Sequence, residues 1–307
     1  MLLREVISGS FLEKTPSPRL AFGVAALLVL IWGTTWAAIR LSLEGFPPFL
    51  SMSVRFAMAS LLLILLTKSR SLPLMGPGRK GWILFWTQSL GAFGIGYALI
   101  YWAEQWVPSG LAAVLFATLP FFVAVLAYFL LPNGSLDWRQ GLGLLLGFLG
   151  VALIFGEDLS ALGGEQVRFA GLVLLFSPIA AALSQIAVKR WASDFHSFTL
   201  SALPMGCSAL MMAVLSFFFE RETPVEPTLV AWLAVAYLGI VGSAFTFTLF
   251  FWLLTKGNIL RVSMIAYGTP VVAVLVGTVF LDEPLTWQLV AGAALVLCGV
   301  FAMVSKK

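Results

Sequence analysis

Charged residues are scarce in this sequence, and their scarcity indicates whether the chain folds in water or in a lipid bilayer. Only 10% of the 307 residues are Asp, Glu, Lys or Arg, whereas 60% are hydrophobic and the mean hydropathy is +1.00. A water-soluble fold of this length could not hide so much apolar surface. The sequence therefore predicts an integral membrane protein whose main surroundings are the lipid bilayer.

Cysteine and histidine are almost absent, which argues against several kinds of site. Cys207 and Cys298 lie in separate apolar runs without CxxC spacing, and the single His196 lies in a polar loop. Neither a disulfide framework nor a zinc site is indicated, and we expect no metal and no cofactor. The basic residues sit in short loops without interleaved aromatic residues, so we expect no nucleic-acid partner.

Motifs for chemistry are lacking as well. The chain has no DxxD, HExxH or Ser/His/Asp constellation, which leaves an integral-membrane enzyme with little support. A nucleotide-binding P-loop is also absent, so no ATP-driven motor is built into the sequence. We expect a protein that is not an enzyme.

Long apolar runs are abundant. A helix needs about 20 mainly apolar residues to cross the hydrocarbon core, and runs of this length favour helices because an unpaired backbone is prohibitive in lipid. Turn residues such as Phe46-Pro47-Pro48 separate the runs. The predicted fold is all-α with ten transmembrane helices, at residues 20–43, 47–67, 81–103, 110–131, 138–155, 169–188, 198–219, 229–254, 259–281 and 287–304.

The basic residues indicate how the chain crosses the membrane. If the N-terminus is cytoplasmic, fourteen of the 18 Lys and Arg residues fall in cytoplasmic segments, and only Arg40, Arg168 and Arg221 fall outside. The positive-inside rule then places both termini in the cytoplasm. The localisation we expect is a bacterial inner membrane. The apolar run from Leu20 is too long for a signal-peptide core and predicts a retained first helix.

The chain compared with itself repeats at a displacement of 149 to 150 residues, which indicates an internal duplication. The coincidences are Trp82 with Trp232, Trp102 with Trp252, Pro120 with Pro270, Trp138 with Trp287, Gly143 with Gly292, and Gly150-Val151 with Gly299-Val300. Five spans in each half is an odd number, so the second half must enter the membrane from the opposite side. The expected organisation is a cytoplasmic segment 1–19, a first repeat 20–156, a periplasmic linker 157–168, an inverted second repeat 169–304 and a cytoplasmic tail 305–307.

Inverted repeats link the sequence to transport. In secondary transporters they place the substrate near the bilayer midplane at the repeat interface, where rocking alternates access to the two sides. Every acidic residue falls in a loop or at the edge of a span, so no carboxylate is available at the midplane to carry a proton. We therefore expect facilitated, downhill export; Glu104 is the nearest carboxylate that could contradict this expectation. A channel or a receptor-like scaffold is a weaker alternative.

The arrangement resembles the drug/metabolite transporter superfamily, specifically its ten-helix EamA-type exporters. The residues that carry the resemblance are Trp32-Gly33, Trp36, Arg55, Pro120, Pro270 and Glu283-Pro284. Members often have a second Glu-Pro at the end of the first half, where this chain has Leu131-Pro132-Asn133-Gly134. Within the group the chain looks most like the YddG-type exporters of aromatic amino acids. The resemblance implies export of aromatic and other neutral amino acids; the alternative is an exporter of other hydrophobic metabolites or drugs. We expect a monomer.

Polar and aromatic residues inside the spans are the candidates for a substrate pocket, because each needs a partner or water at membrane depth. Under the displacement Gln88 corresponds to Tyr237 and Trp36 to Gln185, which suggests equivalent positions on two sides of a central axis. The predicted substrate-binding set is Trp32, Trp36, Gln88, Tyr97, Tyr101, Ser184, Gln185, Tyr237, Ser243, Thr246, Tyr267 and Thr269. The alternative for any single Ser or Thr is a bond to its own helix.

Two prolines and one arginine complete the candidate residues. Pro120 and Pro270 occupy equivalent places in spans four and nine, where each removes a backbone donor and could act as a hinge or merely a packing kink. Arg55 is the one basic residue well inside a span and should face the bundle, where it could brace helices or hold a substrate carboxylate. We favour the bracing role.

Overall fold

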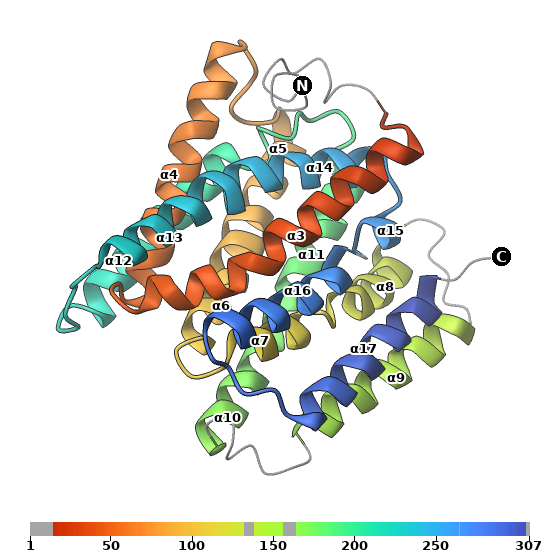
Figure 1. Ribbon diagram of the computed structural model, residues 1–307. Coiled ribbons are helices and arrows are strands. Elements are labelled where there is room, and N and C mark those ends of the chain that lie inside the picture. Colours follow the sequence, from red (N-terminus) through yellow and green to blue (C-terminus); the bar gives the residue numbers. More distant parts are fainter. Residues whose placement is uncertain (1–14, 132–137, 156–163, 264, 305–307) are drawn as a thin grey trace.

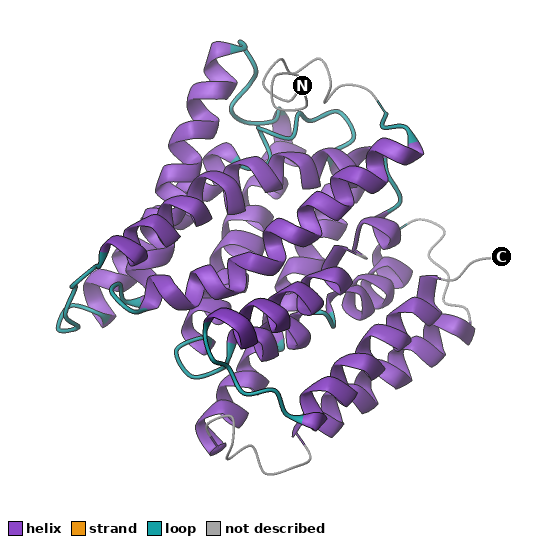
Figure 2. Ribbon diagram, in the orientation of Figure 1, coloured by secondary structure: helices purple, strands orange, loops and turns teal. Residues whose placement is uncertain are grey.

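The computed structural model describes residues 15–131, 138–155, 164–263 and 265–304. Within these ranges the chain forms helices joined by turns and short loops, without a strand (Figure 2). Seven helical segments are long and apolar enough to cross a membrane by length and composition, and three further apolar helices are shorter. Together they make the ten-helix membrane protein that the apolar runs predict.

In the first half, five spans run from residue 18 to residue 155. They are α3 (Pro18–Leu43), α4 (Pro48–Ser69), the continuous α5 (Gly78–Trp86), η1 (Thr87–Gly96) and α6 (Tyr97–Ala103), the pair α7 (Ser109–Phe116) and α8 (Leu119–Leu130), and α9 (Trp138–Phe155). Proline begins several of these helices, as Pro18 and Pro48 do, because its missing N–H would have no partner in the first turn.

The second half repeats this order from residue 164. Its spans are α10 (Gly164–Leu174) with α11 (Phe176–Trp191), α12 (Ala202–Phe219), α13 (Leu229–Gly239) with η3 (Ile240–Phe245) and α14 (Thr246–Lys256), α15 (Ile259–Ser263) with α16 (Ile265–Phe280), and α17 (Trp287–Val304). The sixth span starts five residues before its predicted start at 169. Arg168 forms an ion pair with Glu165 at 2.9 Å, one turn apart, which extends the helix beyond the apolar run.

Equivalent helices of the two halves pack antiparallel. The Ser53 hydroxyl donates to the Ala209 carbonyl at 2.9 Å, and the Ser60 hydroxyl donates to the Ala202 carbonyl at 2.7 Å. Residue numbers therefore rise along α4 while they fall along α12. Since these are the second spans of the two halves, the halves run in opposite directions, and the inverted repeat is confirmed.

The fifth spans of the two halves meet in the same way along a seam of glycines. A Cβ on Gly150 would lie 2.6 Å from the Gly292 carbonyl oxygen, and a Cβ on Gly299 would lie 2.6 Å from the Gly143 carbonyl oxygen. Only glycine allows backbones this close. The displacement relates Gly143 to Gly292 and Gly150 to Gly299, so the two contacts are symmetry mates. Figure 1 shows α9 and α17 lying side by side at one edge of the molecule.

The first span of each half packs against the fourth span of the other half. Helix α3 packs on α16, and α11 packs on α8, so the first span of each half contacts the fourth span of the other half. Interlocked in this way, the two halves share one interior (Figure 1). An axis of pseudo-twofold symmetry therefore passes between α3, α8, α11 and α16.

Two π-helical segments lie at equivalent places and were not predicted from the sequence. The segment η1 interrupts the third span at Thr87–Gly96, and η3 interrupts the eighth at Ile240–Phe245. A shift of 150 residues places η3 inside η1. A π-helical turn breaks the regular bonding of an α-helix and is frequent at functional sites.

Candidate functional site: a cavity on the symmetry axis

A cavity with about 870 Å³ of empty space lies between the two halves. Three spans of the first half (the first, third and fourth) and the three equivalent spans of the second half (the sixth, eighth and ninth) form its wall. The lining residues are Trp32, Thr35, Trp36, Ile39, Gln88, Ala92, Gly96, Tyr97, Ile100, Phe116, Leu119, Ser177, Ala181, Ser184, Gln185, Phe247, Phe250, Phe251, Val262, Ser263, Ile265, Ala266 and Thr269. The cavity therefore lies on the axis that relates the repeats.

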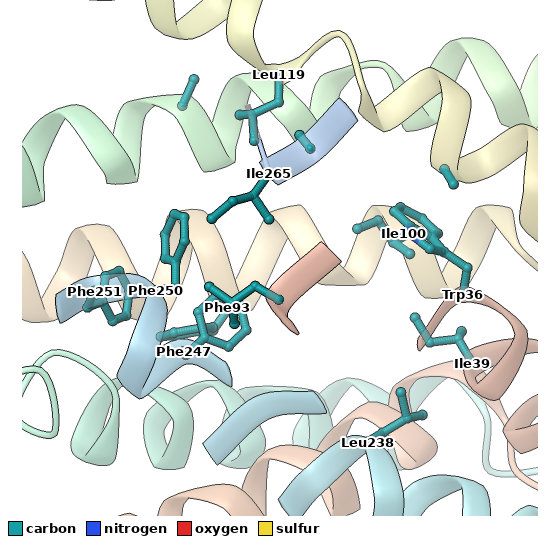
Figure 3. Close-up of a cluster of buried hydrophobic side chains, with 14 of the residues drawn as sticks. Trp36, Ile39, Phe93, Ile100, Leu119, Leu238, Phe247, Phe250, Phe251 and Ile265 are labelled. Carbon is teal, nitrogen blue, oxygen red and sulfur yellow. The ribbon is translucent and has the colours of Figure 1, made fainter. Parts of the chain in front are cut away.

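Aromatic rings make up much of the wall. The Trp32 ring lies 5.3 Å from the Phe247 ring and 5.1 Å from the Phe250 ring, both measured between centroids. On another side, the Trp36 ring lies 5.6 Å from that of Phe116. In Figure 3 the labelled phenylalanines, Phe93 of η1 and Phe247, Phe250 and Phe251 of α14, gather apart from Trp36. Such a wall suits a flat apolar body, which gains from offset stacking.

A pair of hydrogen bonds fixes the third span against the sixth. The Gln88 side-chain amide donates to the Ser184 carbonyl at 3.2 Å, and the Ser184 hydroxyl donates to the Thr87 carbonyl at 2.7 Å. Gly91 permits this close approach, because a Cβ there would lie 2.6 Å from the Ser184 hydroxyl. The π-helical segment η1 is thus held directly on the cavity wall.

Three buried polar atoms on the wall have no hydrogen-bond partner in the described part of the chain. They are the Gln88 Oε1, the Gln185 Oε1 and the Ser177 Oγ. An unpaired buried acceptor costs about 1–3 kcal/mol, so a solute that supplied donors would recover this free energy. The two glutamine oxygens can only accept hydrogen bonds. The cavity therefore favours a ligand that carries N–H or O–H groups.

No Asp, Glu, Lys, Arg or His is among the described lining residues. Arg55 is fully buried and is not among the lining residues. Its guanidinium lies 4.6 Å from the centroid of the Tyr97 ring, and Tyr97 itself lines the cavity. An anionic ligand would thus lose its hydration without meeting a directly accessible cation.

Comparison with known proteins assigns the chain to a family. The sequence pattern of the EamA-like transporter family matches residues 19–156 and again residues 168–305, which together make up most of the chain. The chain belongs to the EamA-like transporter family.

Curated relatives of this family member are similar over most of their length. The uncharacterized transporter YoaV of Bacillus subtilis is 29% identical over 277 residues, covering 89% of this chain and 93% of the relative. An uncharacterized transporter of Archaeoglobus fulgidus is 28% identical, with 92% and 98% covered. The uncharacterized inner membrane transporter YedA of Escherichia coli K12 is 29% identical, with 84% and 81% covered. The EamA family member described here is therefore a multi-pass membrane transporter.

A solved crystal structure has the same fold. It matches with a TM-score of 0.71 at 21% sequence identity, over 92% of this chain and 97% of that one. At this identity the likeness concerns the arrangement of the helices alone.

The structure gathers part of the predicted substrate-binding set on the cavity wall of this EamA family member. Trp32, Trp36, Gln88, Tyr97, Ser184, Gln185 and Thr269 line the cavity. Trp36 and Gln185, which the displacement relates, both belong to the wall. The side chain of Tyr267 lies outside the described part of the chain.

Four predicted residues lie outside the wall. The Thr246 hydroxyl accepts from the Trp32 indole N–H at 3.0 Å and donates to the Gly242 carbonyl at 2.8 Å, so it orients a lining residue from behind. The Tyr237 hydroxyl lies 2.6 Å from the Thr34 hydroxyl. Tyr101 and Ser243 contact Arg55. Choosing polar residues within the spans therefore found both residues that line the cavity and residues that lie behind its wall.

Arg55 joins three spans. Its Nε donates to the Ser243 hydroxyl at 2.8 Å, its Nη1 lies 3.4 Å from the Tyr101 hydroxyl, and its Nη2 lies 3.4 Å from the Gly242 carbonyl. The Gly242 carbonyl lies in η3, where the π-helical turn changes the regular backbone bonding. The guanidinium is therefore positioned as a brace between α4, α6 and η3.

The two equivalent prolines differ in their surroundings. Pro120 lies in the first turn of α8, directly after the break between α7 and α8 at Ala117–Thr118. Pro270 lies inside α16, and its missing N–H leaves the Ala266 carbonyl without its helical donor. The Thr269 hydroxyl donates to this carbonyl at 3.1 Å. Thr269, which lines the cavity, thus supplies the Ala266 carbonyl with a hydrogen-bond donor in place of the missing Pro270 N–H.

The Glu-Pro motif has a structural role at one of its two places. The Glu283 carboxylate accepts from the N–H groups of Ser109 at 2.7 Å and Gly110 at 3.0 Å, which caps the start of α7. The equivalent start of α15 is capped from within, because the Leu260 N–H donates to the Asn258 Oδ1 at 3.0 Å. The diverged segment 132–137 lies outside the described residues.

Sequence reasoning missed the phenylalanines of the wall. Phe247, Phe250 and Phe251 follow one another at the spacing of a single helix face, which is a signal for a shared surface. Lipid-facing phenylalanine has the same spacing in a membrane helix, so the pattern alone could not assign these residues to the interior.

Proposed function

We propose that this transporter exports small metabolites with an apolar body, aromatic and other neutral amino acids first, by alternating access. One observation carries the proposal: the cavity lies on the axis between inverted repeats and has equivalent spans from each half in its wall. Exchanging the packing of the two halves would close one end of such a cavity and open the other. Pro120 and Pro270, in the fourth and ninth spans, would be the hinges.

The chemistry of the wall supports the substrate class. A phenyl or indole ring would stack on Trp32, Trp36 or Tyr97, and each such pair contributes about 0.5–1.5 kcal/mol beyond the buried area. An ammonium group would donate to the Gln88 and Gln185 oxygens that have no partner. A sugar phosphate would meet no lining cation in the described wall, which makes it the expected non-substrate.

Transport is proposed to be downhill, because the described wall holds no carboxylate that could bind a proton together with the substrate. Export across a bacterial inner membrane by a monomer with both termini in the cytoplasm completes the proposal. The relatives' names support the transport activity, whereas the YddG-type substrate is inferred from the cavity. A second candidate function, export of other hydrophobic metabolites or drugs, is supported by the apolar side formed by Phe247, Phe250 and Phe251.

Reconstitution into liposomes tests the proposal. Saturable uptake of labelled Phe and Trp, weaker uptake of Thr and none of a sugar phosphate would support it. Equal and unsaturable flux of all four solutes would overturn it. Saturable uptake of an uncharged aromatic drug, without uptake of Phe, would favour the second candidate.

A further inference from the structure

A cluster of charged residues lies one helical turn beyond the cavity. Trp36 on α3 and Ile100 on α6 line the cavity. Arg40 and Glu104 follow them by four residues, which is about one turn of a helix. Glu104 is the residue that ends α6. The Arg40 guanidinium donates a hydrogen bond to the backbone carbonyl of Glu104, which brings the Arg40 side chain to Glu104 at this end of the cavity.

The Glu104 carboxyl group is buried without hydrogen bonds. The residue is 0% exposed, and neither Oε1 nor Oε2 has a partner in the described structure. An ionised carboxylate in such a place would lose its hydration without compensation. Burial raises the pKa of Glu104 well above its usual range, and the neighbouring Glu283 carboxylate raises it further, against the opposing effects of Arg40 and Arg55.

The neighbouring Glu283 carboxylate has hydrogen-bond partners, whereas the Glu104 carboxyl group has none. The Glu283 carboxylate accepts two backbone N–H bonds at the start of α7, at 2.7 and 3.0 Å, so both of its oxygens have partners. Arg40 is the only cation that the described structure bonds to Glu104, and it bonds the backbone instead of the carboxyl group. The cation that could pair with an ionised Glu104 is thus adjacent but not engaged with it.

The other charged and titratable groups near α6 already have other contacts. Arg55 on α4 contacts Ser243 and the rings of Tyr97 and Tyr101. Glu165 and Arg168 on α10 pair with each other. Further groups on the elements around this cluster are Arg19 and Glu44 at the two ends of α3, Lys68 in the last turn of α4, Asp282 beside Glu283, and Lys189 and Arg190 in the last turn of α11. Glu104 is the carboxyl group of the cluster that the fold leaves unsatisfied.

We propose that Glu104 is a proton-binding site at one end of the cavity, neutral in this conformation and ionised and paired with the Arg40 guanidinium in the alternative one. A small movement of α6 relative to α3 would replace the hydrogen bond from Arg40 to the Glu104 backbone carbonyl by an ion pair between Arg40 and the Glu104 carboxylate. The proton bound at the carboxyl group is released to water in that step. This is a property beyond the proposed export function, since no substrate contact is involved.

The direction of the pH effect follows from the burial. This conformation binds one more proton than the alternative, so raising the pH disfavours it and lowering the pH stabilises it. The effect is confined to the window between the pKa of Glu104 in the conformation paired with Arg40 and its raised pKa in this conformation. Within that window the ratio of the two conformations changes by at most about tenfold per pH unit.

Infrared difference spectroscopy of the reconstituted wild-type protein and its Glu104→Gln variant tests the proposal without any transport assay. Near neutral pH, the wild type should show the carbonyl stretch of one protonated carboxylic acid that the variant lacks. Glutamine has the shape of the protonated acid and should fold normally, and Glu165→Gln is the matched control at an exposed carboxylate. A spectrum without this band near neutral pH would overturn the proposal.

Transport supplies the second measurement. The rate of labelled Phe exchange at equal pH on both sides should vary with pH in the wild type and in Glu165→Gln, and should lose this variation in Glu104→Gln. An unchanged pH profile in Glu104→Gln would contradict the proposal. Failure of all three proteins to transport would count against the proposed function alone, because the infrared band does not depend on it.

Discussion

The Gln88 side-chain amide donates to the Ser184 carbonyl at 3.2 Å, and the same side chain keeps its carbonyl oxygen unpaired at the cavity. The donor atom thus joins two spans that come from different halves of the chain. The acceptor atom is buried and has no hydrogen-bond partner in the described structure. Gln185, one residue beyond Ser184, adds a second unpaired oxygen to the same wall.

Replacing Gln185 by leucine should weaken binding of Phe by about 10-fold or more. The variant loses an acceptor for the substrate ammonium, and hydrogen bonds to charged groups contribute about 1.5–3 kcal/mol. Binding to the purified protein measures the change. Gln105→Leu, at an exposed glutamine, is the control and should bind as the wild type does. Equal affinities of Gln185→Leu and wild type would exclude Gln185 as a substrate ligand.

Replacing Gly292 by leucine should lower thermal stability in detergent, by roughly 1–3 kcal/mol or more, because the side chain would overlap the Gly150 carbonyl. Gly141→Leu is the matched control on the same helix pair, since a Cβ at Gly141 meets nothing within 4 Å. If the two variants melted at the same temperature, the close seam between α9 and α17 would not exist.

Arg55→Lys should reduce stability more than it reduces substrate affinity. Lysine cannot reproduce the bonds to Ser243, Tyr101 and the Gly242 carbonyl at once, and each lost charge-assisted bond costs about 1.5–3 kcal/mol. Thermal melting and Phe binding are measured on the same preparation. The opposite result, a normal melting temperature with weak Phe binding, would assign Arg55 to the substrate carboxylate.

Thr269→Val should slow Phe exchange or destabilise α16. The Ala266 carbonyl would lose the Thr269 hydroxyl, which replaces the backbone donor that Pro270 lacks. Thr269→Ser keeps that hydroxyl and should behave like the wild type in both respects. Exchange rates and melting temperatures of the two variants decide the matter. Equal behaviour of the two variants would show that the bond has no role.

The fold could be predicted from the sequence to a large extent, because membrane depth fixes helix length and rare residues expose the duplication. Trp102 and Trp252, or Gly150 and Gly299, are recognisable as pairs because tryptophan and glycine have few substitutes at a packed position. The inverted orientation then follows from the odd number of spans. The hydrogen bonds from Ser53 and Ser60 to α12 give the same result in the structure.

The cavity could be predicted only in part, because polarity does not distinguish a wall residue from the residue that supports it. Gln88 and Thr246 are both polar and buried, yet Gln88 lines the cavity and Thr246 bonds the indole of Trp32. The π-helical segments shift which side chains face the axis, and no pattern in the sequence indicated them. Phe250 lines the cavity with a residue type that lipid accepts equally well.

Filling the cavity tests the central claim most directly. Ala181 lines the cavity, whereas Ala26 is exposed on α3, so Ala181→Phe and Ala26→Phe add the same side chain inside and outside the site. In liposomes preloaded with unlabelled Phe, labelled Phe should accumulate transiently with the wild type and with Ala26→Phe, and should not accumulate with Ala181→Phe. Transient accumulation of the same size with Ala181→Phe would contradict transport through this cavity.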